Sequence, residues 1–293
     1  MTGLRRVLVA TDFTTGAAAA LPRALLLPLA PGAQLELVHV LPAELPRRLV
    51  ASVRADVAAS LDAALAAAQR LAARAGLDVA LRPRIESGRP VDALLARARA
   101  SRAELLVLGR HGRRVVRDLF IGSTARRLAH RSPIPVLVAN HAATVAYRRP
   151  LVGVDLTHQP DALLATTRAV LGERPLTVRL VHAFQVPFEG MMRRGMSAAA
   201  VKSERAAFRR QARAAMNALC ARHQGGALVW KQSVRRGDPR SVILSEAAQR
   251  RADLVVIGSR GPATLLRALV GGVAETVIDA APGDVLVVPP PPR

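Results

Sequence analysis

Glycine and hydroxyl residues between positions 109 and 124 have the types and spacing expected of an anion site. An apolar run at 105–108 reads as a buried strand, and the glycines begin where the chain must leave the sheet. Glycines let backbone N–H groups approach phosphate oxygens, and a hydroxyl residue can cap a helix whose positive end faces the same anion. The residues, spaced as G-x2-G-x9-G-S, are Gly109, Gly112, Gly122, Ser123 and Thr124.

Glycines at strand ends are also ordinary turn residues, and from the glycines alone that interpretation is favoured. A second occurrence of the pattern changes the balance. It again follows an apolar strand, 149 positions later, and consists of Gly258, Gly261, Gly271 and Gly272.

Other landmarks recur as well, so the chain contains an internal repeat. Asp12 and His39 recur as Asp155 and His182, both after 143 positions. The glycines recur after 149 positions, which leaves six extra residues between His182 and Gly237 in the second half. We expect this insertion to include residues 188–195 as a surface loop before a long helix.

The elements that must position these residues alternate between strands and helices. Apolar or alternating runs predict strands at 5–10, 34–40, 77–85, 105–108 and 134–139, with helices at 15–29, 45–75, 91–100 and 125–131. The series restarts at 151–157 and 178–183. We therefore predict an α/β protein with two tandem, doubly wound parallel-sheet domains at 1–142 and 148–293, joined by a linker within 140–150. Ligands of such folds bind beyond the carboxyl ends of the strands, where Asp12 and Gly109 would lie.

Composition narrows the function classes. The 293 residues are 51% apolar but only 2% aromatic, no apolar run reaches membrane-spanning length, and the N-terminus leads straight into a strand. We therefore expect a cytoplasmic protein without a membrane partner. The single cysteine, Cys220, excludes an intrachain disulfide, and the seven histidines show no metal-ligand spacing.

The formal charge of +22 raises the alternative of a nucleic-acid binder. Split at Tyr147, each half carries +11, and 41 of the 43 basic residues are arginines scattered along the chain. No helix-turn-helix, aromatic stacking platform or RNA-binding signature accompanies the charge. An Ala- and Arg-rich composition that places arginine on solvated helix faces explains it better.

The glycine signature and its repetition resemble the universal stress protein family, in its ATP-binding branch, over nearly the whole chain. The resemblance implies a Rossmann-like strand order of 3-2-1-4-5 in each half. It also implies that the two fifth strands pair across a pseudo-twofold axis, so that the halves form an intrachain pseudo-dimer; a homodimer of chains stays open.

The same resemblance implies roles for residues of the first half. The backbone at Val40 would meet adenine, and Asp12, next to Thr11, would lie near the ribose or a phosphate-bound Mg²⁺. For Asp12 a helix N-cap is the alternative. The phosphates would be held by Gly109, Arg110, Gly112, Gly122 and Ser123, with Thr124 nearby.

The second half departs from the pattern, so its candidate residues are weaker. Gly272 and Val273 replace the two capping hydroxyl residues, and Glu275 replaces Arg126. The second-half candidates are Asp155, Ala183, Gly258, Gly261, Gly271 and Gly272. We expect nucleotide mainly in the first half.

Three function hypotheses follow. The leading one is an ATP-binding stress-response or signalling module. A slow ATPase is second, because no histidine, lysine or carboxylate pair is set up to activate water and no catalytic residue can be named. A basic protein associated with nucleic acid is third.

Overall fold

The computed structural model describes residues 3–110, 123–158, 160–259 and 272–291, without the side chains of Ser123 and Arg193. Its strands are β1 (Leu4–Ala10), β2 (Leu29–Leu41), β3 (Val79–Ser87), β4 (Leu105–Gly109), β5 (Val136–Ala139), β6 (Pro150–Gly153), β7 (Leu176–Phe184), β8 (Leu228–Arg236), β9 (Leu254–Gly258) and β10 (Asp284–Val288). Its helices are η1 (Ala17–Ala19), α1 (Ala20–Leu25), α2 (Arg47–Arg74), α3 (Pro90–Ala100), α4 (Ser123–Arg131), α5 (Pro160–Leu171), α6 (Glu189–Gly195), α7 (Ala198–Arg222), α8 (Pro239–Gln249) and α9 (Val273–Ala280).

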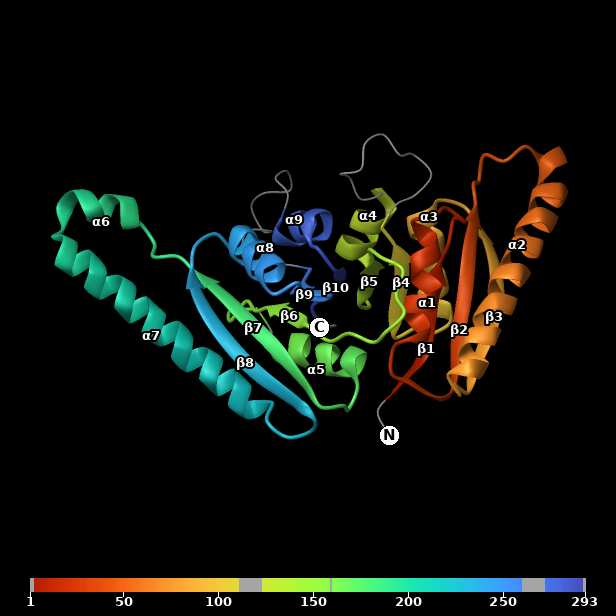
Figure 1. Cartoon of the computed structure of the whole chain (residues 1–293). Helices are drawn as coiled ribbons and strands as arrows, with labels where there is room; N and C mark the ends of the chain where they lie inside the picture. The colour runs from red at the N-terminus through yellow and green to blue at the C-terminus, as the bar shows by residue number, and fades with distance from the viewer. Residues whose placement is uncertain (1–2, 111–122, 159, 260–271, 292–293) are drawn as a thin grey trace.

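The strands form one sheet in the order β3-β2-β1-β4-β5-β10-β9-β6-β7-β8. The first half thus has the expected order 3-2-1-4-5. The second half has the same order reversed, so that the fifth strands of the two halves, β5 and β10, lie side by side at the centre. Within each half neighbouring strands are parallel, whereas β5 and β10 pair antiparallel, with Leu137 opposite Leu286. The predicted pairing of the two fifth strands is therefore confirmed, and it makes one continuous sheet (Figure 1).

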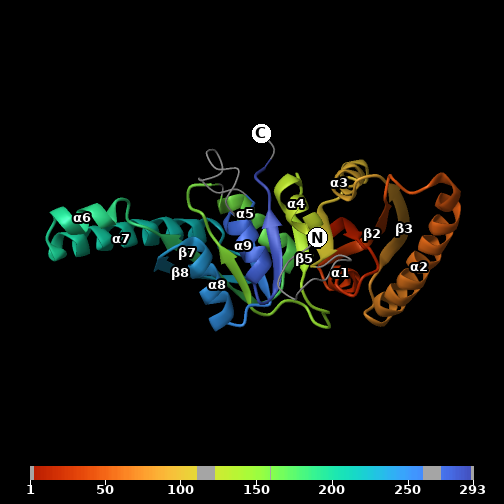
Figure 2. The same cartoon turned by 90° about the horizontal axis from the view of Figure 1, so that it is seen from above.

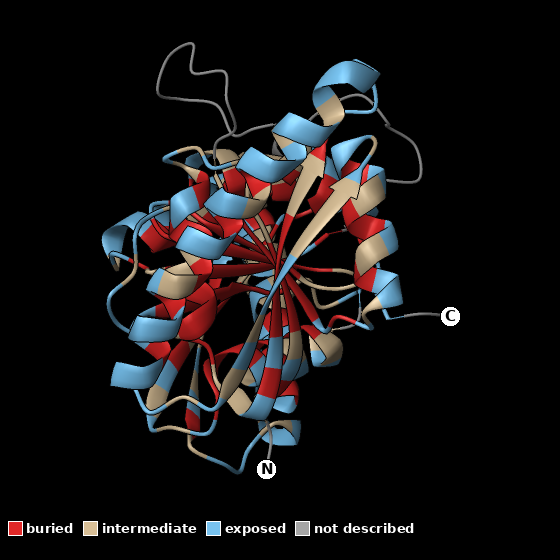
Figure 3. Cartoon of the chain, turned by 90° about the vertical axis from the view of Figure 1, so that its right-hand side faces the viewer, coloured by how far each residue is buried: buried red, intermediate tan, exposed pale blue. Residues whose placement is uncertain are grey.

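Helices cover both faces of the sheet because each strand alternates its side chains between two apolar clusters. In β1, Val7 and Val9 join a cluster with α1, α2, α5 and α7, whereas Leu8 joins a second cluster with α3, α4, α8 and α9. Buried residues gather along the central strands, and the outward sides of the helices are exposed (Figure 3). Since both faces are covered, the central strands are continuous apolar runs.

Two sequence-based assignments need correction. The helix expected over 15–29 ends at Leu25, because residues 29–33 extend β2 instead. The surface loop expected at 188–195 contains the helix α6, which lies beside α7. The edge position expected for the third strand, which contains Pro83, is correct.

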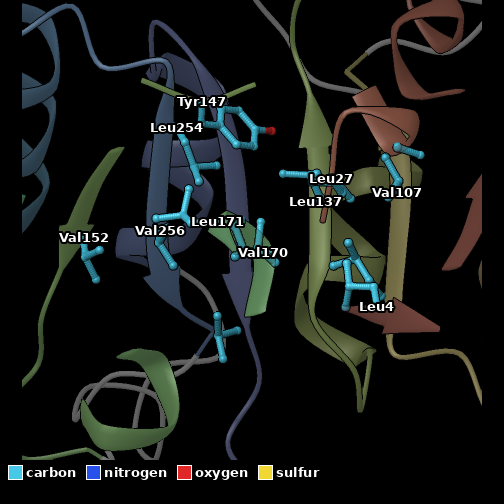
Figure 4. Close-up of a cluster of buried hydrophobic side chains, with 14 of the residues drawn as sticks. Leu4, Leu27, Val107, Leu137, Tyr147, Val152, Val170, Leu171, Leu254 and Val256 are labelled. Atoms are coloured by element: carbon cyan, nitrogen blue, oxygen red, sulfur yellow. The ribbon is translucent and has the colours of Figure 1, made fainter. Parts of the chain in front are cut away.

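The segment between β5 and β6 is bound to both halves by a buried polar network. Asp284 of β10 pairs with Arg23 of α1 at 2.6 Å, and its second oxygen accepts a hydrogen bond from the backbone N–H of Asn140 at 2.8 Å. Tyr147 Oη donates to Asp284 at 2.8 Å, and the Tyr147 ring lies among buried apolar side chains such as Leu254 (Figure 4). Burial raises the pKa of Tyr147 well above its usual value, with the Asp284 carboxylate adding to the effect.

A search of the described helices for a segment long and apolar enough to cross a membrane finds none.

Candidate functional site

The expected site lies at the carboxyl ends of β1 and β4, and the helices α1 and α4 that follow these strands in sequence cover opposite faces of the sheet. These two strands are neighbours, with Val9 opposite Val107. The chain after β1 enters α1 on one face, and the helix α4, which follows β4 in sequence, covers the other. Such a switch in direction opens a crevice at the carboxyl ends of the strands.

The loop after β1 folds on Asp12. The Asp12 Oδ1 atom accepts hydrogen bonds from the backbone N–H and the hydroxyl of Thr14, at 3.0 and 2.6 Å. The Thr11 hydroxyl oxygen accepts from the N–H of Phe13 at 3.1 Å. Asp12 thus shapes the turn before η1. It is not a helix N-cap, because the N-cap position of η1 is Gly16, so the N-cap alternative for Asp12 is wrong.

His39, at the end of β2, fixes this loop from the side. Its Nδ1 lies 3.0 Å from the carbonyl oxygen of Thr11, and since a carbonyl can only accept, Nδ1 carries a proton. The Phe13 ring stacks on the imidazole with 5.0 Å between ring centroids. Phe13 holds a positive φ of 58°, so the loop after β1 keeps an uncommon backbone conformation.

Gly109 allows the ends of β1 and β4 to come together. A Cβ atom at this position would overlap the carbonyl group of Gly16, in the loop that follows Asp12. The glycine is therefore required for backbone packing, whatever it also offers a ligand. The structure brings Thr11, Asp12, Gly109 and Arg110 to one edge of the sheet.

Arg110 reaches across the boundary between the halves. Its guanidinium donates to the carbonyl oxygen of Asp279 in α9, and Arg126 of α4 pairs with the Asp279 carboxylate at 3.3 Å. Burial raises the pKa of Asp279, although Arg126 and Arg110 oppose the shift. The Arg110 Nε atom is buried without a hydrogen-bond partner among the described residues. A buried guanidinium N–H of this kind suits an anionic acceptor.

Of the remaining first-half candidates, the structure describes Val40, Ser123 and Thr124. Val40 is half-buried in β2, opposite Glu86 of the edge strand β3. Ser123 begins α4, and Thr124 is half-buried in its first turn. Gly112 and Gly122 lie outside the described residues.

The second half builds the same loop with different side chains. Asp155 Oδ1 accepts from the N–H and hydroxyl of Thr157, at 2.9 and 2.6 Å, and Oδ2 lies 3.0 Å from Nδ1 of His158. Both oxygens of Asp155 therefore have partners within its own loop. Ala183 pairs with Arg235 in β8.

The start of α9 lacks a side-chain cap. Gly272 occupies the N-cap position with φ −63° and ψ 169°, and no side chain accepts from the first N–H groups. Gly258 ends β9, whereas Gly261 and Gly271 lie outside the described residues. Glu275 of α9 has a partner in the first half, since its Oε1 atom lies 3.1 Å from Nε2 of His130 in α4.

Three contributors to this region were not predicted from the sequence: His39, Phe13 and Asp279. A signal existed for His39, since its counterpart His182 makes the same contact with Val154 at 2.9 Å and the two histidines are in register. Asp279 had no such signal, because its partners lie in the other half.

Within the described residues, no group of three or more histidine, cysteine or acidic side chains could hold a metal ion.

Comparisons with known proteins give one consistent result. The model of the universal stress protein family matches residues 3–140 and 146–289. A solved universal stress protein from Archaeoglobus fulgidus is 16% identical, with 97% of this chain and 98% of that chain covered and a TM-score of 0.67. A putative universal stress protein from Pseudomonas aeruginosa is 20% identical, with 98% and 94% covered and a TM-score of 0.59. No curated protein matches the chain.

Proposed function

This chain belongs to the universal stress protein family as a tandem, two-unit member, and we propose that it binds ATP, mainly in its first half, as a stress-response or signalling module. The observation that supports this most is the switch point at the adjacent carboxyl ends of β1 and β4. There Asp12, Gly109 and Arg110 meet at the point where the connections diverge to opposite faces.

The described residues offer distinct contacts to a nucleotide. Arg110 Nε is a buried donor without a partner in the described chain, which suits a phosphate oxygen. The N-terminus of α4, at Ser123 and Thr124, adds backbone N–H groups and the positive end of a helix. Gly112 and Gly122 are assigned to the phosphates by sequence, and the backbone at Val40 to the base.

A magnesium ion would fit beside Asp12 in this proposal. Mg²⁺ prefers oxygen ligands and is commonly held by one or two carboxylates together with phosphate oxygens. The ion would neutralise phosphate charge next to the Asp12 carboxylate. Asp12 itself holds the β1 loop in place through Thr14 whether or not the ion is bound.

The second half lacks several of these features. His158 already engages Asp155, and Gly272 gives α9 no hydroxyl cap. Ser259 stands where Arg110 stands in the first half, so no guanidinium follows β9 directly. We therefore propose a much weaker site there, or none.

Thermal unfolding with and without ATP and Mg²⁺ tests the proposal. A ligand that binds only the folded chain stabilises it by about 2.7 kcal/mol at a hundredfold excess over its Kd. We expect ATP with Mg²⁺ to raise the Tm at a salt concentration that removes nonspecific ionic contacts, and inorganic phosphate not to do so. An unchanged Tm at millimolar nucleotide would reject the proposal.

Efficient ATP hydrolysis is not part of the proposed function. Among the described residues around Asp12, no histidine and no pair of carboxylates is arranged as a general base. The nearby His39 uses its Nδ1 atom to contact the carbonyl oxygen of Thr11. Turnover near ordinary enzymatic rates, on the order of 10 per second, would favour the ATPase alternative instead.

A further inference from the structure

The helical hairpin of α6 and α7 carries large apolar side chains into solvent at the far end of the second half. Phe188, directly before α6, is 78% exposed, and Met191 in its first turn is 71% exposed. Phe188 precedes the helix in a left-handed conformation, so these two exposed side chains are close in sequence at the start of α6. Met196, just after the helix, is 43% exposed.

The helix α6 is held in position. Glu189 pairs with Arg205 of α7 and with Arg236 at the end of β8, the latter at 2.8 Å. Met192, on the inner side of α6, packs against the apolar core. The exposed side chains are therefore carried by an anchored helix, and their exposure is a property of the fold.

The backbone at Phe188 also carries strain. Its φ of 55° and ψ of 21° lie in the left-handed region, which bulky side chains seldom adopt. Residues kept in such conformations are concentrated at functional sites. The conformation here starts α6 and carries the most exposed of the large apolar side chains on the described chain.

Charge indicates what could cover these side chains. Residues 188–213 contain seven Arg and Lys and two Glu, a formal charge of +5. Arg194 and Lys202 near the tip are exposed, whereas Glu189 is already paired with arginines. An apolar tip with surrounding cations is complementary to a surface that is anionic outside and apolar beneath.

Shape favours a lipid surface over other anionic partners. α6 and the adjoining part of α7 extend beyond the sheet in both views, so the tip can meet a flat surface before the body does (Figures 1 and 2). Single-stranded nucleic acid would need several aromatic side chains to stack on, and this tip has Phe188 with two methionines.

We propose that the exposed apolar side chains at the two ends of α6, Phe188 and Met191 at its start and Met196 just after it, dock the protein peripherally on membranes rich in anionic lipid. The sequence led us to expect no membrane partner, because no apolar run reaches membrane-spanning length, but peripheral docking requires no such run. The proposal does not depend on nucleotide binding.

Sedimentation with lipid vesicles tests this docking. The intact chain should sediment with vesicles that contain phosphatidylglycerol and not with phosphatidylcholine alone, and added salt should weaken the association. A Phe188→Asn/Met191→Ser variant should lose at least roughly tenfold in partitioning, since each buried apolar side chain contributes about that factor. Asparagine tolerates the left-handed conformation, so the variant should melt no lower than the parent chain.

The matched control is Leu71→Ser, which removes an exposed leucine from α2 at the other end of the molecule. It should partition like the parent chain. Equal loss in the control and the double variant, or no loss in either, would assign vesicle binding to general charge and overturn the proposal. Absence of vesicle binding would also overturn it, and retention on single-stranded DNA that only the double variant loses would assign these side chains to nucleic acid.

Discussion

Asp12 and Asp155 occupy equivalent places in the two halves, yet their carboxylates have different neighbours. Both accept a hydrogen bond of 2.6 Å from the hydroxyl of a threonine two positions later in the same loop. Only Asp155 also has a histidine, His158, at 3.0 Å. The first half has Thr15 at the equivalent position. The difference between Thr15 and His158 therefore leaves Asp12 with fewer neighbouring side-chain partners among the described residues than Asp155, and Asp12 is the better candidate to contact a cation.

The start of α9 offers a gain-of-function prediction at the same scale. A Cβ at Gly272 would meet no atom within 4 Å, and its φ of −63° suits any residue. Gly272→Ser should therefore fold and gain a few tenths of a kcal/mol from capping. Combined with Val273→Thr it should strengthen ATP binding in the second half, since a hydrogen bond to a charged group is worth about 1.5–3 kcal/mol.

Titration of ATP into this variant in a Ser123→Ala background would isolate the second site. Detectable new binding supports the role given to the hydroxyls. Binding that stays absent would mean that Asp155 and its histidine, or the missing Arg110 counterpart, limit the site instead.

At the scale of the elements, a position that carries an arginine in one half carries a glutamate in the other. Arg97 of α3 pairs with Glu36 of β2 at 2.5 Å, whereas Glu246, its equivalent in α8, pairs with Arg235 of β8 at 2.7 Å. Both glutamates are buried, at 7% and 4% exposure. Burial raises the pKa of each, but the arginine partners outweigh it and the net shift is downward.

These two pairs predict a pH dependence of stability. A carboxylate with a lowered pKa in the folded chain stabilises it above its unfolded pKa of about 4.3 and ceases to do so as pH falls through the folded value. The free energy of unfolding should therefore decrease below about pH 4.3, and less steeply in a Glu36→Gln/Glu246→Gln variant. Denaturant unfolding between neutral and acidic pH measures this; identical slopes would contradict it.

An arginine and a histidine of α4 also face two carboxylates of α9 where these helices meet. Arg126 and His130 of α4 pair with Asp279 and Glu275 of α9, and the two pairs are equivalent under the repeat. Two copies of α4 in the same arrangement would bring Arg126 against His130, without the carboxylate that Asp279 provides. The helices therefore favour pairing of a first half with a second half over pairing of identical halves.

Reversing one of these pairs tests that preference. Asp279→Arg should lower the free energy of unfolding of the parent chain, and this loss should be about 0.5–1 kcal/mol larger than the loss that the same substitution causes in an Arg126→Asp variant. The difference is small because the ion pair is only partly buried. The double exchange Arg126→Asp/Asp279→Arg should recover most of the loss. A double-mutant cycle from denaturant unfolding gives the coupling, and a coupling of zero would show that the pair has no part in selecting the partner.

How far the sequence predicts these elements depends on whether the cause is local. The central strands and the order 3-2-1-4-5 were predicted correctly, because buried parallel strands are short apolar runs and the family pattern gives their order. The end of α1 was misplaced because residues 29–33 are held in β2 by β1 and β3, which lie elsewhere in the chain. In the candidate site, Asp12 and Gly109 were proposed from their place after strands, and their role stays a prediction. His39, Gly16 and Asp279 contribute through contacts between separate elements.

On the scale of the whole molecule, the ten-stranded sheet depends on the contacts between the halves. The domain limits 1–142 and 148–293 stay a prediction, but the segment that connects the halves is bound to them by hydrogen bonds. Asp284 of β10 bonds the Asn140 backbone, Tyr147 and Arg23. The network places one buried carboxylate, 2% exposed, against a buried arginine, 7% exposed.

Asp284→Ala should therefore destabilise the chain strongly. Removing one partner of a buried ion pair leaves the other charge uncompensated and typically costs about 3–5 kcal/mol. Denaturant unfolding measures the loss, with Asp92→Ala as the control because its ion pair with Arg131 is more than half exposed. A loss below about 1 kcal/mol, the level of exposed pairs, would show that the network does not hold the halves together.

The central claim, one nucleotide per chain held in the first half, is tested most directly by calorimetric titration of the intact chain with ATP and Mg²⁺. We predict a single tight site per chain, which Ser123→Ala weakens by roughly ten- to a hundredfold through the loss of one hydrogen bond to phosphate. Two equal sites per chain, or a Ser123→Ala variant that binds ATP as the parent chain does, would contradict the account.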